Sequence, residues 1–326
     1  MASQILRYAG FGEEATFGTA VPATIHTDIM SATLDTPDDP NLYYPGGLGR
    51  ARRVVRPGYY APTGNVVQGL DVDIAAYLLR WTLGGYNFVA GTPGRHDIWG
   101  TMQNVILPSF TTRVGKDVFE HVFAGCVINS LQIQADDSFA AITADIVAQK
   151  DSGADLASVG DLELSDEVIM AFHEITIAPH APVLEPARVR SMDLNIANNV
   201  DASSGRGIGS RHPYRLPAGE RVISGTFGLW FEDLTQKQSF WGDSAGPAAG
   251  GAFETSITLE IMASLDRRIT INLPSVIISS HNAQPSERNR LDEVITIQAM
   301  VGVSGTTETD ILCQVRNGIG DLNGAY

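Results

Sequence analysis

The sequence predicts a mainly β protein built from two tandem copies of one unit. First, residues 31–81 return as residues 191–241, with an offset of 160 that holds from the first match to the last. Second, apolar and polar residues alternate on both sides of a turn in 127–148 and again in 269–303, which is typical of antiparallel hairpins. Third, the chain has 33 glycines and 16 prolines without a strict period, which favours many turns.

The repeat rests on the order and the constant spacing of its matches. The matched pairs are Leu34 with Leu194, Gly47 with Gly207, Gly49 with Gly209, Pro57 with Pro217, Asp73 with Asp233 and Trp81 with Trp241. Two copies at so long a period indicate a duplicated domain rather than a solenoid of short repeats. We expect a first domain at 1–165, including an N-terminal arm and an acidic linker, and a second domain at 166–326.

The charge of the chain limits what it can bind. The formal net charge is −15 and the pI is about 4.8, which argues against sequence-specific reading of DNA, because that needs basic patches. An acidic surface would instead keep a polyanion from sticking to a wall that it slides past. The alternative is an acidic protein that is merely soluble.

Cysteine usage and hydropathy indicate where the protein is made. Cys126 and Cys313 lie in apolar, strand-like runs, so we expect two buried free thiols rather than a disulfide framework. The N-terminal residues lack the apolar segment of a signal peptide, and no apolar run reaches the roughly 18 residues of a membrane span. We expect a protein of the reducing cytosol without membrane association.

Each copy is expected to run strand, long loop, strand, short helix and hairpin. Residues 1–30 would form an arm or a short edge strand. The first helix would begin at Asp73, a good N-cap, and Trp81 would lie on its apolar face. In the repeat, Asp233 takes the capping position and Trp241 the apolar one. We interpret both tryptophans as core anchors for a helix on a sheet.

The long loop of each copy is basic, which is unusual in so acidic a chain. Residues 36–56 and their echo, 195–216, are rich in glycine and longer than most loops of compact domains, and such loops are usually functional. The basic residues that we take as docking candidates are Arg50, Arg52 and Arg53 in the first loop and Arg206, Arg211 and Arg215 in the second. This pattern favours a docking role, and the alternative is a pair of solvated loops.

No motif selects an enzyme. Gly242–Gly246 matches G-x-S-x-G, but a helix is expected before Ser244 where the nucleophile elbow needs a strand, and His281 is the only possible base after it. The histidines and cysteines lack the spacing of zinc ligands, and no glycine loop has a phosphate-binding pattern. We expect no catalysis, no metal and no cofactor, although an acidic β-fold hydrolase remains an alternative.

Three stretches add to the duplication. They are the opening Tyr8–Ala20, the run Phe119–Leu131 with its polar-tipped hairpin, and the strand Ser191–Ile196 leading into Asn198 and Asn199. In this order they resemble the tail tube proteins of long, non-contractile-tailed bacteriophages (siphophages). The resemblance implies, in each half, a β-sandwich or barrel-like domain with a flanking helix and a long loop.

The resemblance also implies an assembly. Such proteins stack as rings around a lumen for DNA; single-domain members form hexameric rings and two-domain members form trimeric rings of pseudo-sixfold symmetry, so the doubling implies the trimer. The implied partners are further copies of the chain, the tape measure, tail terminator and tail tip proteins, and double-stranded DNA that passes without sequence-specific binding. The implied location is the virion tail, after assembly in the host cytoplasm.

Within such a tube, the polar faces of the hairpin strands would line the lumen. The candidate lumen residues are Gln132, Gln134, Thr143 and Asp145, and the arginines of the two basic loops would dock on acidic surface of the next ring. The alternative within the structural class is a virion decoration or receptor-binding β protein.

Overall fold

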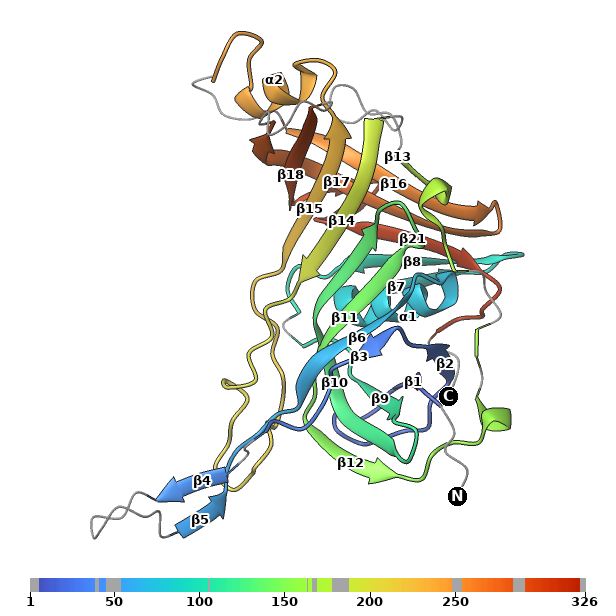
Figure 1. The fold of residues 1–326 in the computed structure, drawn as a ribbon, viewed down its shortest axis with the longest axis vertical. Helices are drawn as coiled ribbons and strands as arrows, with labels where there is room; N and C mark the ends of the chain where they lie inside the picture. The colour runs from blue at the N-terminus through green and yellow to red at the C-terminus, as the bar shows by residue number, and fades with distance from the viewer. Residues whose placement is uncertain are drawn as a thin grey trace.

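The computed structural model describes residues 6–38, 41–44, 54–104, 106–162, 164–165, 169–177, 188–247, 254–283 and 291–322. The chain is mainly β, as the sequence predicts, and two α-helices occur in these ranges (Figure 1).

The elements of the first half surround a single buried helix. They are β1 (Tyr8–Glu13), β2 (Ile25–Asp28), β3 (Ser31–Ala32), β4 (Asn41–Tyr44), β5 (Val54–Pro57), β6 (Thr63–Gly69), α1 (Val72–Leu83), β7 (Gly84–Val89), β8 (Gly94–Gly100), β9 (Phe110–Gly115), β10 (Glu120–Ala135), β11 (Ala141–Val147) and β12 (Lys150–Ala154).

The second half contains longer strands and a shorter helix. Its elements are β13 (Ile175–Ile177), β14 (Val189–Ala197), β15 (Val222–Trp230), α2 (Thr235–Trp241), β16 (Glu254–Ser264), β17 (Arg267–Asn282), β18 (Asp292–Met300), β19 (Gly302–Ser304), β20 (Thr307–Thr309) and β21 (Leu312–Asn317). Two 3-10 turns, η1 (Val159–Asp161) and η2 (Phe172–Glu174), lie between β12 and β13.

A first sheet belongs to the first half alone, in the order β2–β1–β9–β10–β12. Strand β1 lies inside this sheet, and its side chains Tyr8, Ala9 and Phe11 are buried. The expectation of an N-terminal arm or edge strand is therefore wrong for residues 8–13, because these apolar residues pack into the core.

A second, larger sheet runs through both halves of the chain. Its order is β3–β6–β11–β10–β14–β15–β18–β17, with antiparallel neighbours throughout. The first part of β17 pairs with β21, and the sheet continues from β21 through β8 to β7. On its other edge, β17 pairs with β16, which in turn pairs with β13. The pairing of β10 with β14 joins the two halves directly.

The order of pairing in one half recurs in the other. Strand β10 pairs with β9 on one edge and with β12 and then β11 on the other. Strand β17 pairs with β16 on one edge and with β21 and then β18 on the other. From β11 the sheet continues to β6 and β3, and from β18 it continues to β15 and β14. Strand β1 beside β9 corresponds to β13 beside β16.

The segment expected as an acidic linker begins with a strand. Residues 150–154 form β12, which pairs with the first part of β10, and Asp151 lies opposite Phe123. The acidic composition misled the prediction here, because the carboxylate of Asp151 is held by hydrogen bonds from three other segments rather than by water.

Helix α1 starts earlier than predicted. Its N-cap is Asp71, whose Oδ1 accepts hydrogen bonds from the backbone N–H of Asp73 at 2.7 Å and of Ile74 at 3.4 Å. Asp73 therefore lies in the first turn, where a carboxylate suits the helix dipole. The helix ends at Gly84, which has a left-handed φ of 80°.

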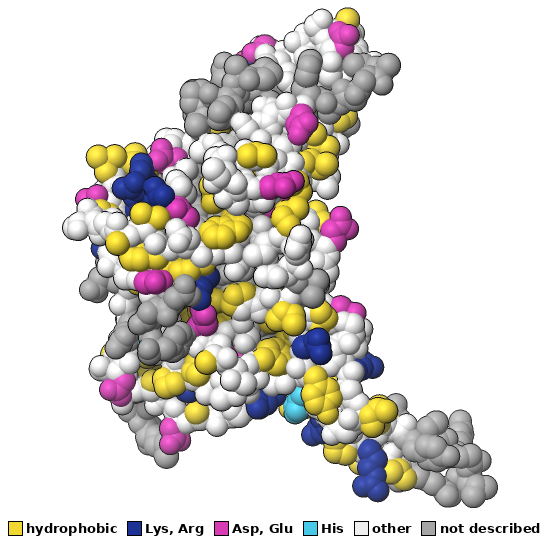
Figure 2. All heavy atoms as spheres, turned by 180° about the vertical axis from the view of Figure 1, so that it is seen from behind, with side chains coloured by type: hydrophobic (Ala, Val, Ile, Leu, Met, Phe, Trp, Pro, Cys, Tyr) yellow, Lys and Arg dark blue, Asp and Glu magenta, His cyan; other side chains and the backbone are white. Residues whose placement is uncertain are grey.

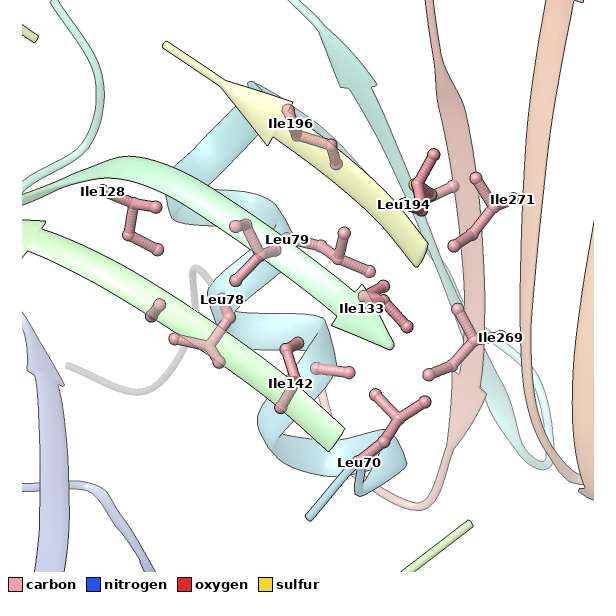
Figure 3. Close-up of a cluster of buried hydrophobic side chains, with 14 of the residues drawn as sticks. Leu70, Leu78, Leu79, Ile128, Ile133, Ile142, Leu194, Ile196, Ile269 and Ile271 are labelled. Atoms are coloured by element: carbon pink, nitrogen blue, oxygen red, sulfur yellow. The ribbon is translucent and has the colours of Figure 1, made fainter. Parts of the chain in front are cut away.

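One apolar core is shared by the two halves (Figure 3). Leu78 and Leu79 of α1 lie against Ile128 and Ile133 of β10. The second half adds further buried side chains to the same cluster: Leu194 and Ile196 from β14, and Ile269 and Ile271 from β17. This shared burial stabilises the contact between the halves, because removing apolar surface from water is the main stabilising term.

Candidate assembly surfaces

The large sheet has one polar face that crosses the junction between the halves. Gln132 and Gln134 of β10 alternate with the buried Leu131 and Ile133, so their side chains lie on this face. Thr143 lies directly opposite Gln132 on β11, and Asn195 lies opposite it on β14. The face continues with Asn65 beside Asp145, then Asp193, Ser224, Thr226 and Thr296.

The charge on this polar face is negative. Asp145 Oδ2 accepts a hydrogen bond from Asn129 Nδ2 at 2.6 Å, and Asp193 Oδ2 accepts one from Gln132 Nε2 at 2.7 Å. On the six fully described strands β6, β11, β10, β14, β15 and β18, the only Lys or Arg is Arg190. Its guanidinium lies 2.7 Å from Asp292 at the end of the sheet, so the middle of the face carries carboxylates and no Lys or Arg on these strands.

The two basic loops lie on the same side of the sheet. The chain leaves β3 and returns to β6 through the hairpin of β4 and β5, and it leaves β14 and returns to β15 through residues 198–219; both extend from the same end of the strands (Figure 1). We call the β4–β5 hairpin the arm and residues 198–219 the second loop. Arg50, Arg52 and Arg53 lie outside the described residues.

The second loop is attached to the base of the arm by its arginines. The guanidinium of Arg206 lies 4.2 Å from the ring centroid of Tyr59, and that of Arg211 lies 5.2 Å from the ring of Tyr60. Arg211 Nε also donates to Gly58 O at 3.1 Å, while its own carbonyl accepts from Tyr60 N at 2.9 Å. These two arginines, expected to dock on another ring, make contacts within the chain. All three arginines of the second loop, Arg206, Arg211 and Arg215, are exposed.

The arm itself presents both apolar and basic side chains to solvent. Val55 is 56% exposed, and Leu42, Tyr43 and Val54 are exposed as well. Figure 2 shows hydrophobic and basic side chains together along this projection. Exposed apolar groups gathered on a projecting hairpin are typical of a surface that binds a partner.

A buried carboxylate holds both ends of the arm. Thr36, on the outgoing side, and Tyr60, on the returning side, both donate hydrogen bonds to Asp151, Tyr60 at 3.1 Å. His121 Nε2 lies 3.0 Å from the same carboxylate. Lys116 Nζ lies 3.1 Å from His121 Nδ1 and forms an ion pair with Asp35 at 2.9 Å.

This network sets the pKa of its carboxylates. Burial alone would raise the pKa of Asp151, but the hydrogen bonds from Thr36, His121 and Tyr60 outweigh it, so the pKa lies below its ordinary value. Asp35 likewise is desolvated, yet Lys116 and the backbone of Thr36 lower its pKa. The sequence analysis missed this cluster, because its members come from four separate segments.

The tryptophans of the two copies differ in burial. Trp81 is fully buried and stacks on Phe110 with ring centroids 4.3 Å apart. Trp241, at the end of α2, is only half-buried, and Lys237 lies 5.3 Å from its ring. The copies therefore place their matching residues in different surroundings.

The G-x-S-x-G match lacks the geometry of a nucleophile. Helix α2 precedes Ser244, whose hydroxyl is 3.3 Å from Asp243 Oδ1 on the exposed turn. His281 is instead buried, with Nε2 3.0 Å from Glu293. A nucleophile needs its base within hydrogen-bond reach, and Ser244 has none among its described contacts.

The described ranges also bear on metal sites, membrane spans and reactive thiols. No group of three or more His, Cys, Asp or Glu side chains there has the arrangement of a metal site, and no helix there has the length and hydropathy to cross a membrane. Cys126 and Cys313 are free and buried; burial raises the pKa of both thiols, that of Cys126 to about 12.

A comparison with protein families identifies the kind of protein to which these surfaces belong. A family model described as phage tail tube protein matches residues 6–299. The chain belongs to the phage tail tube protein family. No curated protein matches it. It is thus a structural protein of the virion tail, and membership implies self-assembly into a tube together with other tail proteins.

Membership in a structural family also bears on the enzyme question. A tail tube protein points to a non-enzymatic role, which agrees with the lack of a histidine among the described contacts of Ser244. The surfaces that matter are then those on which copies of the chain meet and those that face the inside of the tube.

Proposed function

We propose that three copies of this tail tube protein close into a ring of pseudo-sixfold symmetry, and that stacked rings form the tube of a long, non-contractile tail. In this proposal, residues 1–165 and 166–326 are two copies of one tube domain. The support is the recurrence of the strand pairing, from β9–β10–β11–β6–β3 in one half to β16–β17–β18–β15–β14 in the other.

The observation that carries this proposal is the unbroken polar face of the large sheet. Each half supplies four neighbouring strands, and the two sets meet at β10 and β14. A face with Asp145 and Asp193 but no cation in its middle would repel phosphate and let DNA slide past. Screening at physiological salt limits this repulsion to about 8 Å, so the carboxylates act near the wall. Gln132, Gln134, Thr143 and Asp145 are thus our lumen residues.

The arms would provide the contact between successive rings. They leave the sheet at one end with exposed apolar and basic side chains, and the sequence of the arm includes Arg50, Arg52 and Arg53. We assign the arm, rather than Arg206 and Arg211, to docking, because the latter two are engaged with Tyr59 and Tyr60. Reversing the charge of Arg52 and Arg53 should leave folded subunits that form no long tubes.

The remaining partners follow from the same tube. The tape measure protein would fill the lumen before DNA, and terminator and tip proteins would bind the two open ends. Imaging the purified protein at high concentration tests the proposal: hollow tubes or rings support it, while separate compact particles without an axial hole would favour a decoration or receptor-binding protein.

A further inference from the structure

The chain contains one complete example of how one half joins another. The second part of β10 pairs with β14 over six residue pairs, from Ser130 opposite Ala197 to Ala135 opposite Met192. Gln132 and Asn195 lie opposite each other on the polar face in the middle of this junction. If the halves are equivalent, the same junction is available once more, between the end of one chain and the start of the next.

The first strand that this second junction would use is β3. Strand β14 corresponds to β3, because Ser191 pairs with Gly228 of β15 as Ser31 pairs with Val67 of β6. Strand β14 has a partner on each edge, β15 and β10, whereas β3 pairs only with β6 among the described strands. The edge of β3 and the residues that follow it therefore correspond to the edge of β14 that β10 covers.

The other strand is the last part of β17. Strand β10 has a bulge between Ile128 and Ser130 against β11, and β17 has one between Ile278 and Ser280 against β18. The bulges set the correspondence of the two strands, because they mark the same point of the same pairing. Strand β16 accompanies β17 only as far as Ile277, so residues 278–282 show an edge without a strand beside it in the described part of the chain.

The surroundings of both edges also suit a partner. A groove of about 530 Å³ borders β3, and Met30 in its lining is 69% exposed. The lining is mixed, with apolar side chains such as Ile29 and Val114 beside the charged Arg7, Asp35, Lys116 and Asp117. In the first half, β8 and β21 cover α1, and all but one of its residues are buried. Helix α2 packs on β17 but is less covered than α1. Its described buried residues are Gln236 and Ser239, and Leu234 beside it is 51% exposed. A second copy could cover this helix.

We infer that the edge at β3 of one copy adds to residues 278–282 of β17 of a second copy, in the register of the β10–β14 junction. Because Ser280 of β17 corresponds to Ser130 of β10, Asn282 corresponds to Gln132. Because Ser31 of β3 corresponds to Ser191 of β14, Asp35 corresponds to Asn195. Asn282 therefore lies opposite Asp35 on the polar face, as Gln132 lies opposite Asn195 within the chain. The same register places Ser280 opposite Pro37, as Ser130 lies opposite Ala197. This inference rests on the proposed function and adds to it the strand edges and the register.

Cysteine pairs test the register directly. Opposed residues of antiparallel strands have Cβ atoms about 4.5–5.5 Å apart, close enough for a disulfide with slight adjustment. The two native thiols are buried and should give little background. The test variant is Asn282→Cys with Asp35→Cys, and a second variant, Ser280→Cys with Pro37→Cys, leaves the Asp35–Lys116 ion pair intact. The control, Asn282→Cys with Ser31→Cys, is displaced by four residues, or about 13 Å.

Each protein is assembled and treated with a mild oxidant. Its covalent species are separated by denaturing electrophoresis without reductant, and the same samples are imaged. We expect covalent dimers and trimers from most chains of both test variants, reversed by reductant, and no more than background from the control. Rings or tubes that carry no specific crosslink, or equal crosslinking in the control, would overturn the junction and leave the proposed function standing. Folded protein that gives neither rings nor crosslinks under any condition would overturn both.

Discussion

His121 Nε2 and the carboxylate of Asp151 lie 3.0 Å apart beneath the arm. Asp151 also accepts hydrogen bonds from Thr36 and Tyr60, the residues on either side of the arm. The two sides of the projection that we assign to ring stacking thus meet at one buried carboxylate, which holds its base together with the contacts of the second loop.

Replacing Asp151 with Asn should weaken this attachment. The amide keeps one acceptor but loses the charge that three donors share, which should cost about 2 kcal/mol of unfolding free energy. Chemical denaturation of the isolated subunit measures the cost. Asp155→Asn, at an exposed position four residues away, is the matched control and should change stability little; equal effects of the two would remove the special role of Asp151.

The same network predicts how stability depends on pH. The pKa values of Asp35 and Asp151 are lowered in the folded protein, so their contribution is fully present above the ordinary aspartate pKa. It should be lost as the pH falls from about 4 through the lowered pKa values. Denaturation midpoints measured from pH 7 to pH 2 should show a shallower acid loss in Asp151→Asn than in the wild type, and parallel curves would contradict this.

The paired tryptophans offer a comparison within one chain. Trp81→Ala removes a fully buried ring that stacks on Phe110, and should lower the unfolding free energy by about 4 kcal/mol. Trp241→Ala removes its half-buried counterpart and should cost only about 1 kcal/mol in the isolated subunit. Urea titrations of the two variants check this order, which a larger effect at Trp241 would reverse.

Charge on the polar face should control whether tubes bind DNA. Wild-type tubes should not sediment with short duplex DNA, whereas tubes carrying Asp145→Lys and Asp193→Lys should bind it, and raising the salt should release it. Asp266→Lys, on the exposed turn between β16 and β17, changes charge away from this face. DNA binding by that control to the same degree would show that the face does not line the lumen.

The arginines of the second loop should act on assembly through its attachment to the arm. Arg206→Ala with Arg211→Ala removes both cation–π contacts, each worth about 1 kcal/mol at an exposed site. We expect folded subunits with a more protease-sensitive second loop and slower tube growth by light scattering. Arg215→Ala is the matched control, and growth that slows equally in the control would argue for direct docking by all three arginines.

The sequence predicted those parts of the fold that depend on short-range pattern. The alternation around 127–148 predicted the hairpin of β10 and β11, and the helical spacing up to Trp81 predicted α1. The predicted N-cap was Asp73, whereas the observed N-cap is Asp71. Both positions hold aspartate, a good capping residue, and only the extended backbone of Asp71 decides between them.

Contacts between distant segments were beyond the sequence pattern. The apparent linker residue Asp151 is in a strand because the backbone of β12 pairs with β10, and its carboxylate meets His121, Tyr60 and Thr36. Arg206 and Arg211 looked like free docking groups because their aromatic partners, Tyr59 and Tyr60, lie about 150 residues earlier in the sequence. Such pairs become visible only when the strands are placed beside one another.

The number of chains in each ring tests the central claim most directly. Helical reconstruction of tubes grown from the purified protein would measure it. The account predicts three chains around each ring, six similar domains, and a continuous inner sheet that presents Gln132 and Asp193 to the lumen. Six chains to a ring, or unlike positions for the two halves relative to the axis, would contradict it.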